Sequence, residues 1–125
     1  MAYKRKIEKD IRCPLEYGMD VFGGKWKSRI LCVLADGQLR YSALRESMAN
    51  VTDAALAGAL KDLQENGLVA RVQFDEIPPH VEYSLTAKGQ SVIPVLQTIC
   101  AWSGVYYKNV DDDALARCQK CDFRG

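Results

Sequence analysis

The sequence has one histidine, and its five cysteines follow no regular spacing. The histidine and the one closely spaced cysteine pair, Cys118 and Cys121, are an incomplete ligand set for a structural zinc ion, so we expect neither a metal nor another cofactor. A serine–histidine–aspartate set, a glycine-rich phosphate-binding loop and a recognisable pair of catalytic carboxylates are all missing. We therefore expect a protein that is not an enzyme.

Long hydrophobic runs are also missing. No apolar run approaches the roughly 20 residues that a membrane-spanning helix requires, and the charged N-terminus lacks the apolar segment of a signal peptide. An odd number of cysteines without a disulfide framework is typical of a reducing compartment. These absences predict a cytoplasmic protein with no membrane partner.

The composition is that of one folded domain with an uneven distribution of charge. The 125 residues are 48% hydrophobic and the net charge is only +1. Residues 1–45 nevertheless carry ten basic and five acidic side chains, whereas the rest of the chain carries seven basic and eleven acidic ones. A basic segment suits a polyanion such as DNA, although such asymmetry is also common on solvated surfaces.

Apolar side chains recur at helical spacing in four segments, residues 14–22, 25–35, 41–49 and 52–65. Proline suits the first position of the first helix, and the glycine pair at residues 23–24 ends it. The third and fourth helices are joined only by Asn50-Val51. Two short helices joined so briefly are typical of a helix-turn-helix.

The segment of residues 52–65 has two different faces. Thr52 is expected to cap this helix, and one apolar stripe is formed by Leu56, Ala59, Leu60 and Leu63. The opposite face carries the small residues Ala54 and Gly58, followed by Lys61. Such a face allows the helix backbone to approach the floor of a DNA groove, but an ordinary amphipathic helix has the same apolar spacing.

After residue 67 the apolar period changes from helical to two. Leu68, Ala70, Val72 and Phe74 alternate with other residues, which predicts a half-buried strand, and residues 81–85 predict its return strand. Thr86 is expected to cap a last helix to about residue 110, in which Pro94 should produce a kink or mark the effective start. One stripe of that helix is formed by Val95, Ile99, Trp102 and Tyr106, widened by Leu96 and Cys100.

The order of these elements predicts a winged helix-turn-helix in one domain, mainly α with a small β-hairpin (α+β), with additional N- and C-terminal helices that form a dimer interface. We expect the helix-turn-helix at residues 41–66, the wing at 68–85, a C-terminal dimerisation helix at 86–110 and a charged tail at 111–125. Internal repeats and low-complexity linkers are missing from the sequence.

Several motifs resemble those of the HxlR-type bacterial transcription regulators. They are CPLEY at residues 13–17, GGKWK at 23–27, Arg40-Tyr41, the 56–63 helix, NGLV at 66–69, and Pro78-Pro79 followed by VEYSLT at 81–86. The resemblance covers about residues 13–102. It implies a homodimer that binds double-stranded DNA, with dimer contacts from the terminal helices. In some relatives a cysteine at the position of Cys13 senses oxidants or electrophiles.

Within this family pattern the sequence indicates a DNA-facing set. Basic side chains at helix starts are expected to contact phosphates, although a solvated basic face is the alternative. Asp53 would meet a cytosine amino group or help to cap the helix. His80, at the wing, would contact a phosphate or the minor groove, or it would be an exposed turn residue. The candidate DNA-binding residues are Lys25, Lys27, Arg40, Tyr41, Thr52, Asp53, Ala54, Ala55, Gly58, Lys61 and His80.

Cys13 is the candidate redox-sensing thiol. A helix start and the preceding Arg12 favour the thiolate, whereas Glu16 opposes it, and a half-buried structural cysteine is the alternative. Its possible disulfide partners are Cys100, Cys118 and Cys121, and the effector would be a small electrophile or oxidant. The last two cysteines are also compatible with a second redox pair, a weak metal chelate or two exposed thiols.

The terminal helices carry the candidate dimer contacts, which are Leu15, Met19, Leu96, Ile99, Trp102 and Tyr106. Two other functions remain open at this point. One is a thiol-disulfide redox protein that uses the C-terminal CxxC, and the other is a winged-helix module that binds another protein.

Overall fold

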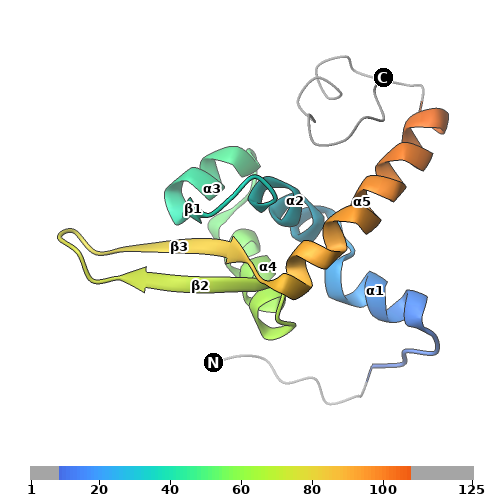
Figure 1. The fold of residues 1–125 in the computed structure, drawn as a ribbon, viewed down its shortest axis with the longest axis horizontal. Coiled ribbons are helices and arrows are strands. Elements are labelled where there is room, and N and C mark those ends of the chain that lie inside the picture. Colours follow the sequence, from blue (N-terminus) through green and yellow to red (C-terminus); the bar gives the residue numbers. More distant parts are fainter. Residues whose placement is uncertain (1–8, 108–125) are drawn as a thin grey trace.

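The computed structural model describes residues 9–107, so Cys118, Cys121 and the predicted tail lie outside the described residues. Within residues 9–107, five helices and a three-stranded antiparallel sheet of order β1-β3-β2 form the fold. The elements are α1 (Pro14–Phe22), α2 (Lys25–Leu34), β1 (Leu39–Arg40), α3 (Tyr41–Met48), α4 (Asp53–Glu65), β2 (Val69–Phe74), β3 (His80–Leu85) and α5 (Ala87–Tyr106). The β2–β3 wing projects to one end of the molecule, whereas α1 and the C-terminal part of α5 lie at the other (Figure 1).

The helix-turn-helix forms where the sequence predicts it. Thr52 caps α4, since its side-chain oxygen accepts a hydrogen bond from the Ala55 N–H at 3.0 Å. The predicted stripe of α4 is buried and packs with residues of α2 and α3 in one core. The largest fully buried side chains of that core are Ile30, Leu31, Leu34, Leu44, Met48, Leu56, Leu63 and Leu68. Burial of each such side chain contributes roughly 1.5–3 kcal/mol, which anchors α4 to the domain.

The α3–α4 connection is a tight turn. Ala49 has φ 39° and Asn50 has φ 62°, and Asn tolerates this left-handed region better than most residues. Val51 is buried, which anchors the turn to the core. The turn therefore sets the direction in which α4 leaves α3.

The sheet differs from the prediction in two respects. The short strand β1 was not predicted, and it pairs through Leu39 with Tyr83 of β3. Val72, predicted to face the core, is 40% exposed. Only the base of β2 reaches the helices, where Leu68 and Val69 are buried, and the outer part of the wing extends beyond the core.

The last helix also differs. It begins after the cap Thr86, as predicted, because the Thr86 side chain accepts a hydrogen bond from the Gly89 N–H at 3.1 Å. Pro94 lies inside α5 and does not mark its start. The helix ends at Tyr106, earlier than the predicted residue 110, and Tyr107 already has an extended backbone (φ −84°, ψ 97°).

Candidate nucleic-acid interface

The outer face of α4 is exposed and carries little side-chain volume. Ala54, Gly58 and Lys61 are exposed, while Ala55 is partly buried against the core. A Cβ atom added at Gly58 would have no atom within 4 Å apart from the adjacent residues and the local backbone of α4 itself. Packing within the protomer therefore does not require glycine at this position.

A hollow of about 790 Å³ lies beside this face. Residues at the start of α2 and residues of α4 line this hollow together. Both groups include candidate DNA-binding residues that were predicted from the sequence. Its lining includes Lys25, Trp26, Lys27, Ala54, Gly58 and Lys61. The remaining lining includes Asp20, Asp62 and Glu65, so the hollow is not uniformly basic.

The two lysines of α2 are not equivalent. The Lys25 Nζ atom lies 4.7 Å from the ring centroid of Trp26, and Arg29 lies over the same ring at 5.3 Å. The partly buried Lys27 Nζ instead donates a hydrogen bond to the Asp20 carbonyl oxygen in α1, at 2.7 Å. Lys27 therefore links α1 to α2, whereas Lys25 is exposed toward solvent.

Asp53 has a partner that the sequence did not reveal. Arg45 of α3 donates from Nε to the Asp53 Oδ1 atom at 2.6 Å. Thr52, not Asp53, provides the side-chain cap of α4. The pair connects the two helices of the helix-turn-helix, but the eight-residue separation of Arg45 and Asp53 gives no local sequence signal.

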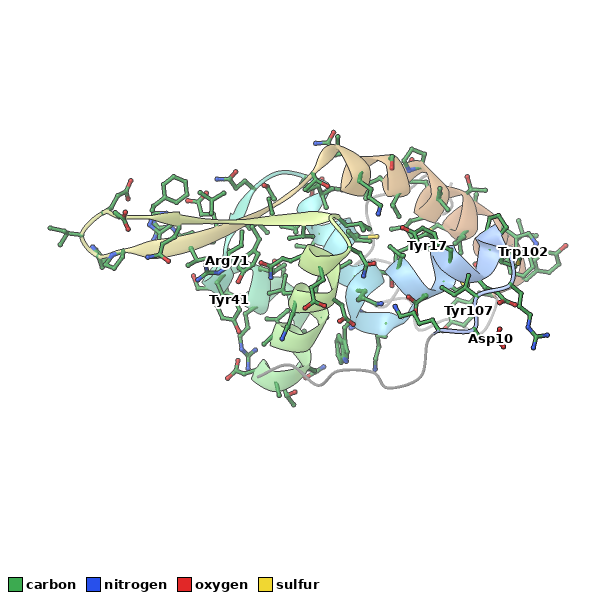
Figure 2. All side chains as sticks on the ribbon, turned by 90° about the horizontal axis from the view of Figure 1, so that it is seen from below. Asp10, Tyr17, Tyr41, Arg71, Trp102 and Tyr107 are labelled. Carbon is green, nitrogen blue, oxygen red and sulfur yellow. The ribbon has the colours of Figure 1, made fainter. Side chains whose placement is uncertain are left out.

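Arg40, Tyr41 and Arg71 lie where the sheet meets α3. Arg40 is exposed at the end of β1, and the Tyr41 ring lies 6.4 Å from that of Tyr83. Arg71 of β2 is exposed and is the strand neighbour of Tyr83. Figure 2 shows Arg71 and Tyr41 at the same flank. Arg71 was not predicted as a site residue, because the period-two pattern marks it only as a solvent-facing strand position.

His80 is enclosed by the wing, so the alternative of an exposed turn histidine is wrong. Its side chain is 13% exposed, its Nε2 atom lies 2.8 Å from the Glu82 Oε2 atom, and its ring stacks on Phe74 with centroids 4.9 Å apart. The Nδ1 atom faces Glu76 Oε1 at 3.6 Å. The pKa of Glu82 is lowered from 4.5, first because Gln38 donates a hydrogen bond to it and second because of the hydrogen bond with His80.

Cys13 is exposed and immediately precedes α1, so the half-buried alternative does not hold in the single chain. The Arg12 guanidinium pairs with Asp10, with Nη2 at 3.2 Å from Oδ2. The Glu16 carboxylate accepts a hydrogen bond from the Arg12 backbone N–H at 2.8 Å. Cys100 lies partly buried on α5, and the other two candidate disulfide partners lie outside the described residues.

The end of the molecule opposite the wing has a large apolar surface. Leu15 is 70% exposed, Trp102 67% and Tyr106 68%, and Met19 and Ile99 are also exposed. Figure 2 shows Trp102 and Tyr107 at this end. Leu96 was predicted to make dimer contacts, but it is only 8% exposed and belongs to the protomer core.

Within residues 9–107, the helices are too short or too polar to cross a membrane.

The comparisons with known proteins agree with this geometry. The model of the HxlR-like helix-turn-helix family matches residues 21–111. A protein named as an uncharacterized HTH-type transcriptional regulator, from Methanothermobacter thermautotrophicus, is 44% identical over 94 residues, which are 75% of this chain and 72% of that protein. The relatives are thus named as regulators, not as enzymes.

Solved structures give the same result. The redox regulator HypR in its oxidized form is 35% identical, with a TM-score of 0.71, and the match covers 78% of this chain and 100% of that one. The reduced form of the transcriptional regulator YodB from Bacillus subtilis is 32% identical, also with a TM-score of 0.71, and covers 81% of this chain and 100% of its own. The winged helix-turn-helix prediction is confirmed.

Proposed function

The chain belongs to the HxlR-like helix-turn-helix family of transcriptional regulators, and we propose that it binds double-stranded DNA as a homodimer. The observation that carries the proposal is the exposed, small-residue face of α4, which has Lys25 beside its hollow and Lys61 toward its C-terminal half. A helix of this kind can enter a major groove while helix starts and basic side chains contact phosphates.

The proposed binding mode depends more on phosphates and DNA shape than on paired hydrogen bonds to bases. Ala54 and Gly58 cannot donate side-chain hydrogen bonds, although Ala54 and Ala55 can contact thymine methyl groups. Arg40, Tyr41 and Arg71 would contact the DNA backbone from the base of the wing. His80 would act indirectly, because its ring is held between Glu82, Glu76 and Phe74.

The homodimer would form through the apolar end of the molecule. The exposed residues of α1 and α5 are too many for a small monomer to leave in water. We propose that two copies joined there present their α4 helices on the same side of the dimer. Dimeric readers of this kind place their recognition helices about 34 Å apart, which is one DNA turn.

We further propose that modification of Cys13 controls DNA binding. Cys13 is exposed at the start of α1, a helix of the proposed dimer surface. Two similar proteins of known structure are a redox regulator, HypR, and YodB, which has been solved in reduced and diamide-treated forms. With diamide, two thiols would form a disulfide while diamide takes up two electrons and two protons. A quinone would instead alkylate one thiol.

The test of DNA binding is a selection from random-sequence duplexes, followed by fluorescence anisotropy and sedimentation. We expect enrichment of a palindrome that binds with submicromolar affinity as one dimer per duplex. A protein that enriches no sequence, or that sediments as a monomer on and off DNA, would contradict the proposal.

A further inference from the structure

Lys88 occupies an electrostatically unfavourable position. It is the second residue of α5, two positions after the cap Thr86, where the helix dipole disfavours a cation. Its Nζ atom nevertheless donates hydrogen bonds to the Asn66 carbonyl oxygen at 2.9 Å and to the Tyr17 hydroxyl at 3.0 Å. The ammonium also lies 5.7 Å from the Tyr17 ring centroid. Lys88 therefore connects α5 with α1 and with the C-terminal end of α4.

Asn66 is the C-cap of α4, so Lys88 compensates the negative end of that helix dipole. The adjacent backbone is fixed to α5 as well. The Thr86 N–H donates to the Leu68 carbonyl oxygen at 3.0 Å, and a Cβ atom at Gly89 would lie 2.1 Å from that same oxygen. The C-terminal end of α4 and the start of α5 thus form one closely packed unit.

Tyr17 connects this unit to the proposed dimer surface. It lies on α1 between the exposed Leu15 and Met19, and one helical turn after Cys13. Its hydroxyl accepts the Lys88 hydrogen bond. The Tyr17–Lys88–Asn66 chain of contacts therefore runs from the helix that carries Cys13 to the end of α4.

We propose that Lys88 is a positioning residue for DNA binding, which holds the axis of α4 at a fixed angle to α1. The 13 residues of α4 span about 20 Å. A tilt of about 5° at the C-terminal end moves the N-terminal end by about 2 Å, more than a hydrogen bond to a base or phosphate tolerates. In a dimer this angle sets the separation of the two recognition helices. The inference rests on the proposed function.

The test compares Lys88→Met, which keeps the aliphatic stem, with Tyr17→Phe, which keeps the ring. Both are measured against the palindrome selected by the wild-type protein, and against the same palindrome with one base pair added or removed between its half-sites. We expect each variant to bind the selected palindrome about five-fold or more weakly and to lose the preference for its spacing. The double variant should bind no more weakly than Lys88→Met alone, because that substitution already removes the hydrogen bond to the Tyr17 hydroxyl.

The salt dependence separates positioning from direct contact. Lys88→Met should leave the slope of log K against log salt unchanged, whereas Lys61→Met, which removes a charge on the outer face of α4, should reduce it by about one unit without changing the preferred spacing. Amide hydrogen exchange at residues 62–67 of the free protein should accelerate in Lys88→Met and in Tyr17→Phe.

Two failures are distinguishable. A wild-type protein that selects no palindrome overturns the proposed function. If the wild-type protein selects a palindrome, either of two results overturns the positioning role of Lys88. One is that the variants keep the wild-type affinity and spacing preference. The other is that Lys88→Met reduces the salt slope by one unit.

Discussion

Gly58 is placed where a helix gains nothing from glycine. It lies on the exposed face of α4, and an added Cβ atom would meet no neighbour within 4 Å. Glycine inside a helix costs roughly 0.5–1 kcal/mol relative to alanine. If the backbone of α4 approaches a DNA groove closely, glycine at position 58 would permit that approach at a cost in stability.

Gly58→Ala should raise the free energy of unfolding by about 0.5–1 kcal/mol and weaken DNA binding. The opposite signs are the informative result, because a destabilised protein would lose both properties together. Thermal melts and anisotropy titrations on one protein preparation measure them. A more stable variant with unchanged affinity would show that α4 does not approach DNA at this position.

Lys25 and Lys27 should respond differently to substitution. Lys25→Ala and Arg40→Ala should each reduce the salt slope of DNA binding by about one unit, as expected for a lost phosphate contact. Lys27→Ala should also lower the free energy of unfolding by ~1 kcal/mol, because it removes the hydrogen bond to the Asp20 carbonyl oxygen. Wild-type slopes for Lys25→Ala and Arg40→Ala would place the DNA on another face.

The wing carries a carboxylate, Glu82, whose protonation is expected to change the stability of the fold. Glu82 accepts hydrogen bonds from Gln38, which directly precedes β1, and from His80 of the same strand β3, so the first bond ties the segment before β1 to β3. Its pKa is lowered from 4.5 by these two bonds. A lowered folded-state pKa stabilises the fold above the unfolded-state value, and this contribution disappears as the pH falls through the folded-state pKa.

Acidification from about pH 5 downward should therefore destabilise the wild-type protein more steeply than Glu82→Gln. Thermal melts between about pH 3 and 6 measure the difference. Glu76→Gln is the control, since Glu76 is more exposed and lies 3.6 Å from the His80 Nδ1 atom. Parallel pH profiles for wild type and Glu82→Gln would contradict the assignment.

Local signals made some elements predictable. The start of α4 was found because Thr52 is a cap with a hydrogen bond only three residues away, and its end because Asn66-Gly67 follows. Strand β1 was missed because two residues carry no period, and its pairing with Tyr83 is distant in sequence. The point at which the wing leaves the core, near Val72, also depends on tertiary packing.

The same distinction applies to the candidate interface. The exposed small residues of α4 follow from helical spacing, so the sequence revealed them. The contacts of Lys27 with Asp20, of Arg45 with Asp53 and of Lys88 with Tyr17 join residues that only the packed helices bring together. Sequence periodicity carries no information about such pairs.

In the whole molecule the proposed dimer surface lies at the end opposite the wing, whereas the proposed DNA-binding surface extends from the start of α2 along α4. Trp102→Glu should convert a dimer into a monomer, because it places a charge in the apolar surface. In that surface the ring centroids of Trp102 and Tyr106 lie 5.3 Å apart. Sedimentation at micromolar concentration measures this change, and the Gln97→Glu variant on the same helix is the charge control. A wild-type protein that is already monomeric would contradict the proposed dimer.

Chemical modification of Cys13 tests whether the proposed dimer surface is coupled to the proposed DNA-binding surface. The thiol is exposed at the start of α1, and α1 contacts the end of α4 through Tyr17 and Lys88. A disulfide or an alkyl group at Cys13 changes the packing at the proposed interface, and a coupling of ~1–3 kcal/mol would change DNA affinity about 5- to 150-fold.

We expect diamide or a quinone to alter binding, with dithiothreitol reversing only a disulfide. Cys13→Ser should bind DNA normally and ignore both reagents, whereas the Cys118→Ser/Cys121→Ser variant should still respond. Loss of the response only in the latter variant would identify the CxxC as the sensor, and an unchanged response in both would contradict control by either site.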